Sequence, residues 1–229
     1  MTPISNEQFL SLRQHAELIE ADHHGEKVLK LSDGSFLKLF RRKRLISSEM
    51  YRPYAVRFAL NAESLKTLQI PCPTIIATYA IASIERTAVH YWPLPGATLR
   101  QAFQETGECH ATLTAALGAF IARLHHSGVY FRSLHLGNIV KTPENPLGLI
   151  DIADMKILRN PIGNQKRKRN FRHLFRYNAD VATLAVHRDK FITAYCEHLP
   201  PKEKNEFSEF LGSLFMDSKS QRAKQEKTP

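Results

Sequence analysis

The chain has 229 residues, of which 43% are hydrophobic, enough to bury the core of one large domain or of two small lobes. Thirty-two basic residues against 22 acidic ones give a formal net charge of +10, so the composition favours an anionic partner. The sequence contains no run of about 18 apolar residues, and its first residues include acids but no apolar core, which excludes a recognisable transmembrane helix or secretory signal. These features predict a globular, cytoplasmic protein.

The cysteines argue against two kinds of structural site, and the basic residues leave several anionic partners possible. Cys72, Cys109 and Cys196 are far apart and odd in number, which argues against a disulfide framework and against a metal-binding spacing. The basic excess is concentrated in two runs, RRKR at 41–44 and KRKRNFRHLFR at 166–176. Such runs suit nucleic acid, an anionic membrane surface or a phosphorylated substrate, and they also suit a solvated face that keeps the protein soluble.

Strand and helix patterns alternate in the N-terminal part of the chain. Ser5 is a suitable N-cap for an amphipathic helix over residues 5–19. Two alternating apolar runs flank Ser32-Asp33-Gly34, a sequence typical of a β-hairpin turn. The remaining patterns predict strands at 28–31, 36–40, 74–79 and 87–92 and a helix at 54–69.

Helical patterns predominate in the C-terminal part. The predicted helices lie at 98–104, 111–128, 171–177 and 180–198, and Gly128 is well placed to end the second of them. Residues 148–155 have the composition of a short buried strand, and residues 217–229 that of a disordered tail. The sequence therefore predicts an α+β protein with a β-rich lobe over 1–92 and a mainly helical lobe over 93–216.

Lys38 is a candidate for binding a phosphate group. It lies in the second hairpin strand between Leu37 and Leu39, so its side chain points to the face opposite these leucines. Phosphoryl transfer needs such a lysine, together with metal ligands and a group that orients the attacking hydroxyl. Glu63 in the following helix could pair with Lys38 and hold it in place, and Glu49 is the weaker alternative.

Asn138 and Asp151 are candidate ligands for Mg²⁺. Asn138 lies five residues after Ser133 in a loop, and Asp151 follows thirteen residues later, directly behind an apolar stretch. Amide and carboxylate oxygens are hard ligands of the kind that Mg²⁺ prefers. A carboxylate beside a buried strand also needs a cation or hydrogen-bond donors.

Four segments together resemble the protein-kinase-like superfamily and, within it, the small bacterial lipopolysaccharide kinases that phosphorylate Kdo or heptose in the inner core. The segments resemble the nucleotide-lysine strand, the lobe hinge, the catalytic loop and the metal-binding segment of that family: FLKLF, YWPLPGATLRQAF, HHSGVYFRSLHLGNIV and LGLIDIADMKIL. The resemblance covers about Val28 to Tyr195, and the chain is also similar to the "toluene tolerance" proteins of pseudomonads. It implies a bilobal protein-kinase-like fold with a small β-rich N-lobe and a mainly helical C-lobe.

The resemblance also implies ATP and Mg²⁺ as cofactors and a role for each candidate residue. Lys38 would contact the α- and β-phosphates with Glu63 as its partner, and His135 would lie near the transferred phosphate. Asn138 and Asp151 would hold the metal. The edge of the adenine would meet the segment that contains Tyr91, Trp92 and Leu94.

Three departures from the family pattern concern activity. Ile152-Ala153 replaces the Phe-Gly that follows the metal-binding Asp, and Gly25 alone stands where a glycine-rich loop is expected. Ser133 occupies the position of the Asp that accepts the proton of the substrate hydroxyl, and a serine cannot act as a base near neutral pH without an activating partner. General-base help is worth about 10² to 10⁴-fold. His135 could take the proton instead, and Asp154 is a more remote substitute.

Three functions remain open at this point. The first is an ATP-dependent kinase that acts on a sugar hydroxyl of the lipopolysaccharide core, or of another anionic glycolipid, with peripheral contact to the inner face of the inner membrane. The second is a pseudokinase, a nucleotide-binding scaffold or regulator of envelope biogenesis. The third is a nucleic-acid-associated protein; it is disfavoured because the aromatic residues within 166–176 have a spacing suited to packing a helix.

Overall fold

The computed structural model describes residues 1–41, 52–105 and 110–225, with side chains to Met216. The chain forms two compact units. The N-terminal unit consists of Met1–Pro95 and Leu149–Asp154, and the C-terminal unit consists of Gly96–Gly148 and Met155–Pro229. The division after Pro95 is close to the predicted one after residue 92, but the segment that contains Asp151 belongs to the N-terminal unit.

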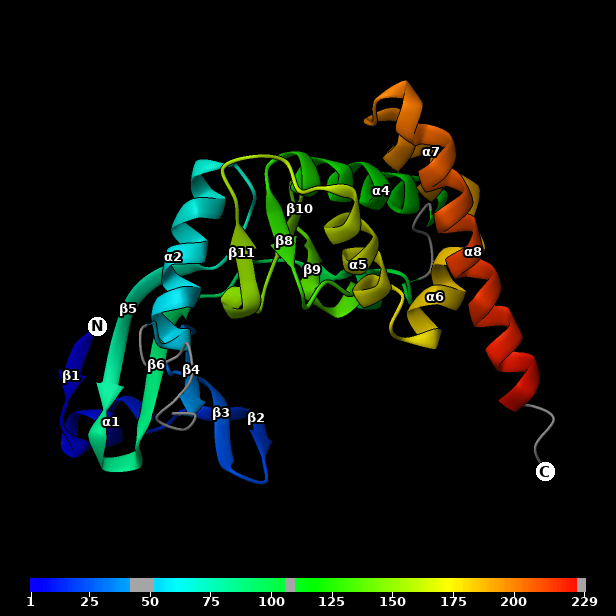
Figure 1. Cartoon of the computed structure of the whole chain (residues 1–229). Helices are drawn as coiled ribbons and strands as arrows, with labels where there is room; N and C mark the ends of the chain where they lie inside the picture. The colour runs from blue at the N-terminus through cyan, green and yellow to red at the C-terminus, as the bar shows by residue number, and fades with distance from the viewer. Residues whose placement is uncertain (42–51, 106–109, 226–229) are drawn as a thin grey trace. The chain divides into compact units, whose positions relative to one another are not determined.

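A six-stranded sheet forms the N-terminal unit, with strand order β1-β5-β6-β4-β3-β2 (Figure 1). Its strands are β1 (Thr2–Ile4), β2 (Glu17–Asp22), β3 (Gly25–Lys30), β4 (Phe36–Arg41), β5 (Thr74–Ile81) and β6 (Arg86–Trp92). Helices α1 (Asn6–Arg13) and α2 (Tyr54–Thr67) and the short 3₁₀ turns η1 (Ala82–Ile84) and η3 (Ile152–Asp154) complete the unit. β1 pairs with β5 in parallel, and the other neighbours are antiparallel.

The two faces of this sheet are covered by different helices, as the alternation in β4 predicts. Leu37 and Leu39 are buried in the cluster to which α1 contributes. Lys38 and Phe40 point to the opposite face, where Phe58 of α2 lies 6.5 Å from the ring of Phe40. The predicted orientation of Lys38 is therefore confirmed, and so is the hairpin turn, in which Gly34 has a φ of +88°.

The helix predicted over residues 5–19 is too long, and β1 was not predicted. Ser5 does cap α1 and accepts a hydrogen bond from the backbone of Gln8, but the helix ends at Arg13. His15 then adopts a φ of +63°, which no α-helix contains, and residues 17–22 pair with β3 as an edge strand. Backbone pairing with a neighbouring strand has overridden the helical spacing of the sequence here.

The C-terminal unit is mainly helical. Its helices are α3 (Leu99–Ala102), α4 (His110–His126), α5 (Asn164–Leu174), α6 (Asn178–Ala185), α7 (Arg188–Glu197) and α8 (Pro201–Gln225). Short strands and one 3₁₀ turn connect them: β7 (Ala97–Thr98), β8 (Val129–Phe131), η2 (Leu136–Asn138), β9 (Ile139–Lys141), β10 (Leu147–Leu149, at the boundary of the units) and β11 (Met155–Ile157). A β-rich unit followed by a mainly helical one confirms the predicted α+β class.

Several predicted boundaries in this unit need correction. The strand expected over 148–155 is two short strands, β10 and β11, on either side of η3. The helix expected over 180–198 is interrupted between α6 and α7, and α5 begins before the predicted 171–177. α8 continues to Gln225, into the segment for which disorder was predicted, and the Lys, Gln, Arg and Ala residues there are good helix formers. No helix among the described residues is both long and apolar enough to cross a membrane.

Close packing of α4 on α7 organises the core of the C-terminal unit (Figure 1). Gly118 of α4 permits the approach, since a Cβ atom at this position would lie 2.4 Å from the carbonyl oxygen of Phe191. His125, in the last turn of α4, is 1% exposed and contacts the Tyr195 hydroxyl through Nδ1 at 3.0 Å and Asn170 Oδ1 through Nε2 at 3.1 Å. Its environment lowers the pKa of the imidazole to about 3, mainly because burial disfavours the charged form.

This buried histidine should make the protein sensitive to acid. The unfolded chain binds a proton at His125 below a pH of about 6.5, whereas the folded chain does not until about pH 3, so stability falls as the pH drops between these values. The loss is at most about 1.4 kcal/mol per pH unit. Urea unfolding at pH 7 and pH 5 should show a smaller drop for His125→Gln than for the wild type. Equal drops in the two proteins would contradict this assignment.

Candidate functional site

Lys38 and Asp151 form an ion pair in the N-terminal unit. The Nζ atom of Lys38 lies 2.5 Å from Oδ1 of Asp151, although the two residues are 113 positions apart in the sequence. The side chain of Lys38 is 13% exposed and that of Asp151 is 46% exposed, so the pair is accessible from the carboxylate side. The sequence predicts that Lys38 binds phosphate groups and that Asp151 binds the metal ion of the same ligand. In the structure these two residues are in direct contact.

Asp151 is held in an uncommon backbone conformation. Its φ of +53° lies in the left-handed region, which residues other than glycine seldom adopt. Neighbouring contacts hold the segment in place: the Leu149 N–H donates to the Pro71 carbonyl at 2.9 Å, and Asn61 Nδ2 of α2 donates to the Ile152 carbonyl at 2.7 Å. Strain that is maintained in this way is typical of functional positions.

Glu63 is not brought to Lys38. The face of α2 that meets the Asp151 segment carries Arg57, which pairs with Asp154 at 3.5 Å, and Asn61. A residue two positions after Asn61 is rotated by about 200° around a helix with 3.6 residues per turn. Glu63 is accordingly exposed, and it lines a groove of about 630 Å³ on the other side of α2. The alternative partner, Glu49, lies outside the described residues.

Tyr91 lies on the same face of the sheet as Lys38. It stands directly opposite Phe36 across β4 and β6, and its ring lies 5.3 Å from that of Phe58. Burial raises the pKa of the Tyr91 phenol. Trp92 is 45% exposed and Leu94 is half-buried, so of the three residues predicted along the adenine edge only Tyr91 has its side chain placed by core packing.

A tight turn joins β2 to β3 where a glycine-rich loop was expected. Gly25 has a φ of +103°, and the Asp22 carboxylate accepts the His24 N–H at 2.8 Å. The guanidinium of Arg86 donates to the carbonyls of both His24 and Glu26. The turn is therefore fixed by side chains, and it contains one glycine, as the sequence indicates.

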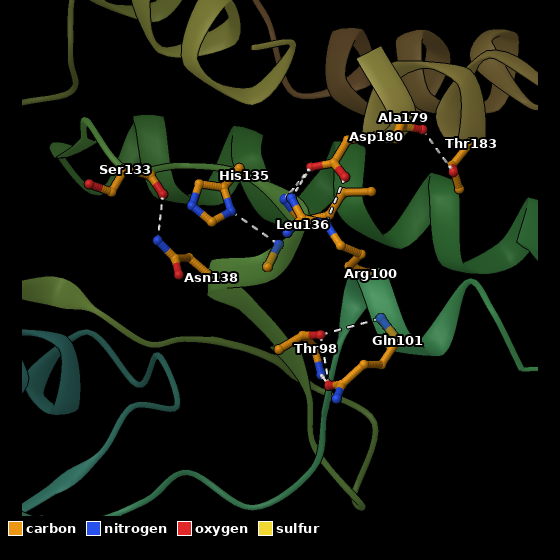
Figure 2. A network of polar contacts seen from close by, with 11 residues as sticks. Thr98, Arg100, Gln101, Ser133, His135, Leu136, Asn138, Ala179, Asp180 and Thr183 are labelled. Atoms are coloured by element: carbon orange, nitrogen blue, oxygen red, sulfur yellow. Dashed lines mark hydrogen bonds and ion pairs between the residues drawn. The ribbon is translucent and has the colours of Figure 1, made fainter. Parts of the chain in front are cut away.

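Asn138 and Ser133 are connected within the loop of the C-terminal unit, as Figure 2 shows. The Nδ2 atom of Asn138 donates to the backbone carbonyl of Ser133 at 2.9 Å. Asn138 is 7% exposed, and the hydrogen bond from Nδ2 fixes the orientation of its side-chain amide. Oδ1 is the other polar atom of this amide. The serine hydroxyl takes no part in this contact.

His135 is oriented as a hydrogen-bond donor and not as the base that the sequence suggested. Its Nδ1 accepts the N–H of Gly137 at 3.1 Å (Figure 2). Its ring meets the ring of Tyr177 edge-on, with the ring centroids 5.3 Å apart. In a neutral imidazole with Nδ1 as acceptor, the proton resides on Nε2. In this state Nε2 is a donor and does not take a proton from a hydroxyl.

Arg100 and Asp180 support the same loop, and the sequence analysis missed both. Asp180 is 2% exposed and accepts from Arg100 through Nε at 2.9 Å and Nη2 at 2.8 Å (Figure 2). Its Oδ2 also accepts the N–H of Leu136 at 3.3 Å. The hydrogen bond to Asp180 raises the pKa of Arg100. The sequence signal for Asp180 was weak, because an acidic residue in the first turn of a helix usually reflects only a favourable interaction with the helix dipole.

The predicted metal ligands have a chemistry that fits Mg²⁺. Asp151 offers a carboxylate that is part-exposed, and Asn138 offers an amide oxygen, and both are hard ligands. Lys38 carries the charge that suits phosphate oxygens. When bound, Mg²⁺ would neutralise charge on the phosphates of ATP.

The order of the elements agrees with the protein-kinase-like fold expected from the sequence: a hairpin with Lys38, a helix, two strands and then a helical unit that contains the Ser133–Asn138 loop. No protein-family model matches the chain, and no curated protein matches its sequence. One of the solved structures that match is a divergent kinase of Toxoplasma that lacks the glycine-rich loop and regulates membrane ultrastructure of the parasitophorous vacuole. That match has a TM-score of 0.41 at 20% identity and covers 80% of this chain. This chain spans 61% of the Toxoplasma chain.

Proposed function

We propose that the chain binds ATP with Mg²⁺ through Lys38 and Asp151 and that it transfers phosphate poorly or not at all. The observation that carries the proposal is the ion pair between these two residues, with Asp151 held at a φ of +53°. A strained carboxylate in contact with a largely buried lysine suits a ligand that brings both a cation and phosphate groups.

The loop around Ser133 supports the loss of efficient transfer. Ser133 is not a base at neutral pH, and the hydrogen bond from Gly137 to His135 Nδ1 leaves the neutral imidazole with its proton on Nε2. In this proposal Lys38 and Asp151 serve the nucleotide and its metal, whereas neither Ser133 nor the neutral imidazole of His135 accepts the proton of an acceptor hydroxyl. This combination fits a pseudokinase, and a scaffold or regulator in envelope biogenesis is the role that we propose for it.

A slow kinase is the second candidate, and one observation favours it. Asp180 and Arg100 hold the backbone of the loop at Leu136 in one conformation, and such positioning is what phosphoryl transfer requires. Phosphoryl transfer depends mostly on positioning and charge, so loss of the base lowers the rate without abolishing it. The acceptor would be a sugar hydroxyl of the lipopolysaccharide inner core or another anionic glycolipid, reached from the cytoplasmic side.

The position of Ser133 provides the test between the two candidates. We expect Ser133→Asp to increase the transfer of label from γ-labelled ATP to deacylated lipopolysaccharide core fragments by about 10² to 10⁴-fold, because it supplies the absent base. For a pseudokinase, the wild type should transfer no more label than Asp151→Asn. For a slow kinase, it should exceed that background. If Ser133→Asp transfers no label although it binds ATP, the loop is not a phosphotransferase loop.

A further inference from the structure

Helix α5 carries an unusual concentration of positive charge. Its sequence, NQKRKRNFRHL, contains five Lys or Arg residues and no acid, and no acidic residue stands in its first turn. Cations at a helix N-terminus oppose the helix dipole, and like charges three or four positions apart repel each other. An anionic partner would relieve both effects.

Two of these five cations are used within the fold. Arg167 pairs with Glu203 of α8 at 3.5 Å and also donates to the carbonyl of Ile162 at 2.8 Å. Lys168 pairs with Glu206 of α8 at 2.6 Å. Arg167 and Lys168 thus attach α5 to α8, and they are not available to an external partner.

The other cations form what we call the basic stripe: Lys166, Arg169, Arg172 and Arg176, the last just beyond the end of α5. All four are exposed, and their spacing of three, three and four places them along one side of the helix axis. Ten residues at about 1.5 Å each make a line of about 15 Å. No residue of the stripe has an acidic partner in the part of the chain that the structure describes.

Two of the three aromatic residues in and just after α5 do not accompany the stripe on the surface. Phe171 is fully buried against Tyr195, with ring centroids 4.7 Å apart, and Phe175 packs on Phe215 at 4.6 Å. Phe171 and Phe175 therefore cannot stack on bases, which removes two of the three aromatic residues that suggested nucleic acid. Tyr177, 42% exposed at the end of the stripe, has the apolar ring and hydroxyl that suit the surface of a bilayer.

We infer that the basic stripe is a docking surface for an anionic phospholipid bilayer. The four side chains are exposed and have no acidic partner among the described residues, although Arg172 also lies over the Phe210 ring of α8 at 5.6 Å and Arg176 over the Tyr177 ring at 5.9 Å. A row of such cations can approach a flat layer of phosphate headgroups without any change in the fold. Each cation near such a surface adds a similar increment of binding free energy, so three together are worth about 100-fold in the partition coefficient. The inference does not depend on nucleotide binding.

Sedimentation with vesicles tests this surface. We expect the wild type to bind phosphatidylcholine vesicles that contain phosphatidylglycerol, and to bind pure phosphatidylcholine vesicles negligibly. The triple variant Lys166→Gln, Arg169→Gln, Arg172→Gln should lower the partition coefficient by about 100-fold. A control with the same net charge changes three other exposed lysines of the C-terminal unit: Lys156→Gln, Lys190→Gln, Lys202→Gln. The control should retain at least a third of wild-type binding.

Three results would overturn the inference. The first is equal loss in the stripe variant and the control, which would mean that only net charge matters. The second is wild-type binding that does not distinguish the two kinds of vesicle. The third is complete displacement of the protein from anionic vesicles by an equal charge concentration of single-stranded oligonucleotide, which would identify nucleic acid as the preferred partner. Circular dichroism and the melting temperature of each variant verify that it is folded.

Discussion

Asp151→Asn should abolish the stabilisation of the protein by ATP and Mg²⁺. A ligand present at about 100 times its Kd stabilises a folded chain by about 2.7 kcal/mol, which corresponds to a rise in Tm of about 5–10 °C for a chain of this size. Asparagine is the appropriate replacement because it tolerates the left-handed backbone that Asp151 adopts, whereas alanine would add strain. Thermal unfolding with and without nucleotide measures the effect.

Two further variants test whether loss of the nucleotide-induced shift in Tm is specific to the Lys38–Asp151 pair. Lys38→Met should reduce the shift in Tm as strongly as Asp151→Asn, since it removes the charge for the phosphates. Asp189→Asn removes a carboxylate that is 87% exposed in the C-terminal unit, and it should leave the shift unchanged. A full shift in Asp151→Asn, or an equal loss in all three variants, would contradict the assignment of the Lys38–Asp151 pair.

The second large effect concerns Asp180, whose removal should destabilise the C-terminal unit by about 2–4 kcal/mol. In Asp180→Ala the buried N–H of Leu136 loses its acceptor, and the guanidinium of Arg100 loses two hydrogen bonds. Arg100→Met should cost at least as much, because it leaves the carboxylate of Asp180, whose side chain is only 2% exposed, without its cation. Urea unfolding measures both.

Asp189→Ala provides the control, with an expected change within about 0.5 kcal/mol of the wild type for an exposed carboxylate. If Asp180→Ala were as mild as this control, the hydrogen bonds to Asp180 would not be stabilising the loop. If Arg100→Met were as mild as this control, the ion pair would not be stabilising the buried carboxylate of Asp180.

Local patterns predicted those features that depend on a few neighbouring residues. The turn at Asp33-Gly34, the inward leucines on either side of Lys38 and the end of α4 before Gly128 all follow from alternation or from a positive φ that glycine accepts. The candidate residues Lys38 and Asp151 were also chosen from the sequence, and they meet in one ion pair.

Long-range packing determined the rest. The rotation of α2 is fixed by the burial of Ala55, Phe58 and Leu65, and this rotation, which the sequence does not specify, directs Glu63 to the far side of the helix. Asp180 joins Arg100 across 80 positions of sequence, so no local pattern connects them. The protonated nitrogen of His135 likewise depends on a backbone N–H that only the folded loop presents.

The most direct test is to recover the nucleotide after binding. The protein is incubated with Mg²⁺ and γ-labelled ATP, separated rapidly from free nucleotide, and the bound label is resolved into ATP and phosphate. We predict that the wild type retains ATP that remains intact, and that Lys38→Met and Asp151→Asn retain none above background. Absence of bound nucleotide in the wild type, at ATP concentrations up to the millimolar range, would contradict the proposed function.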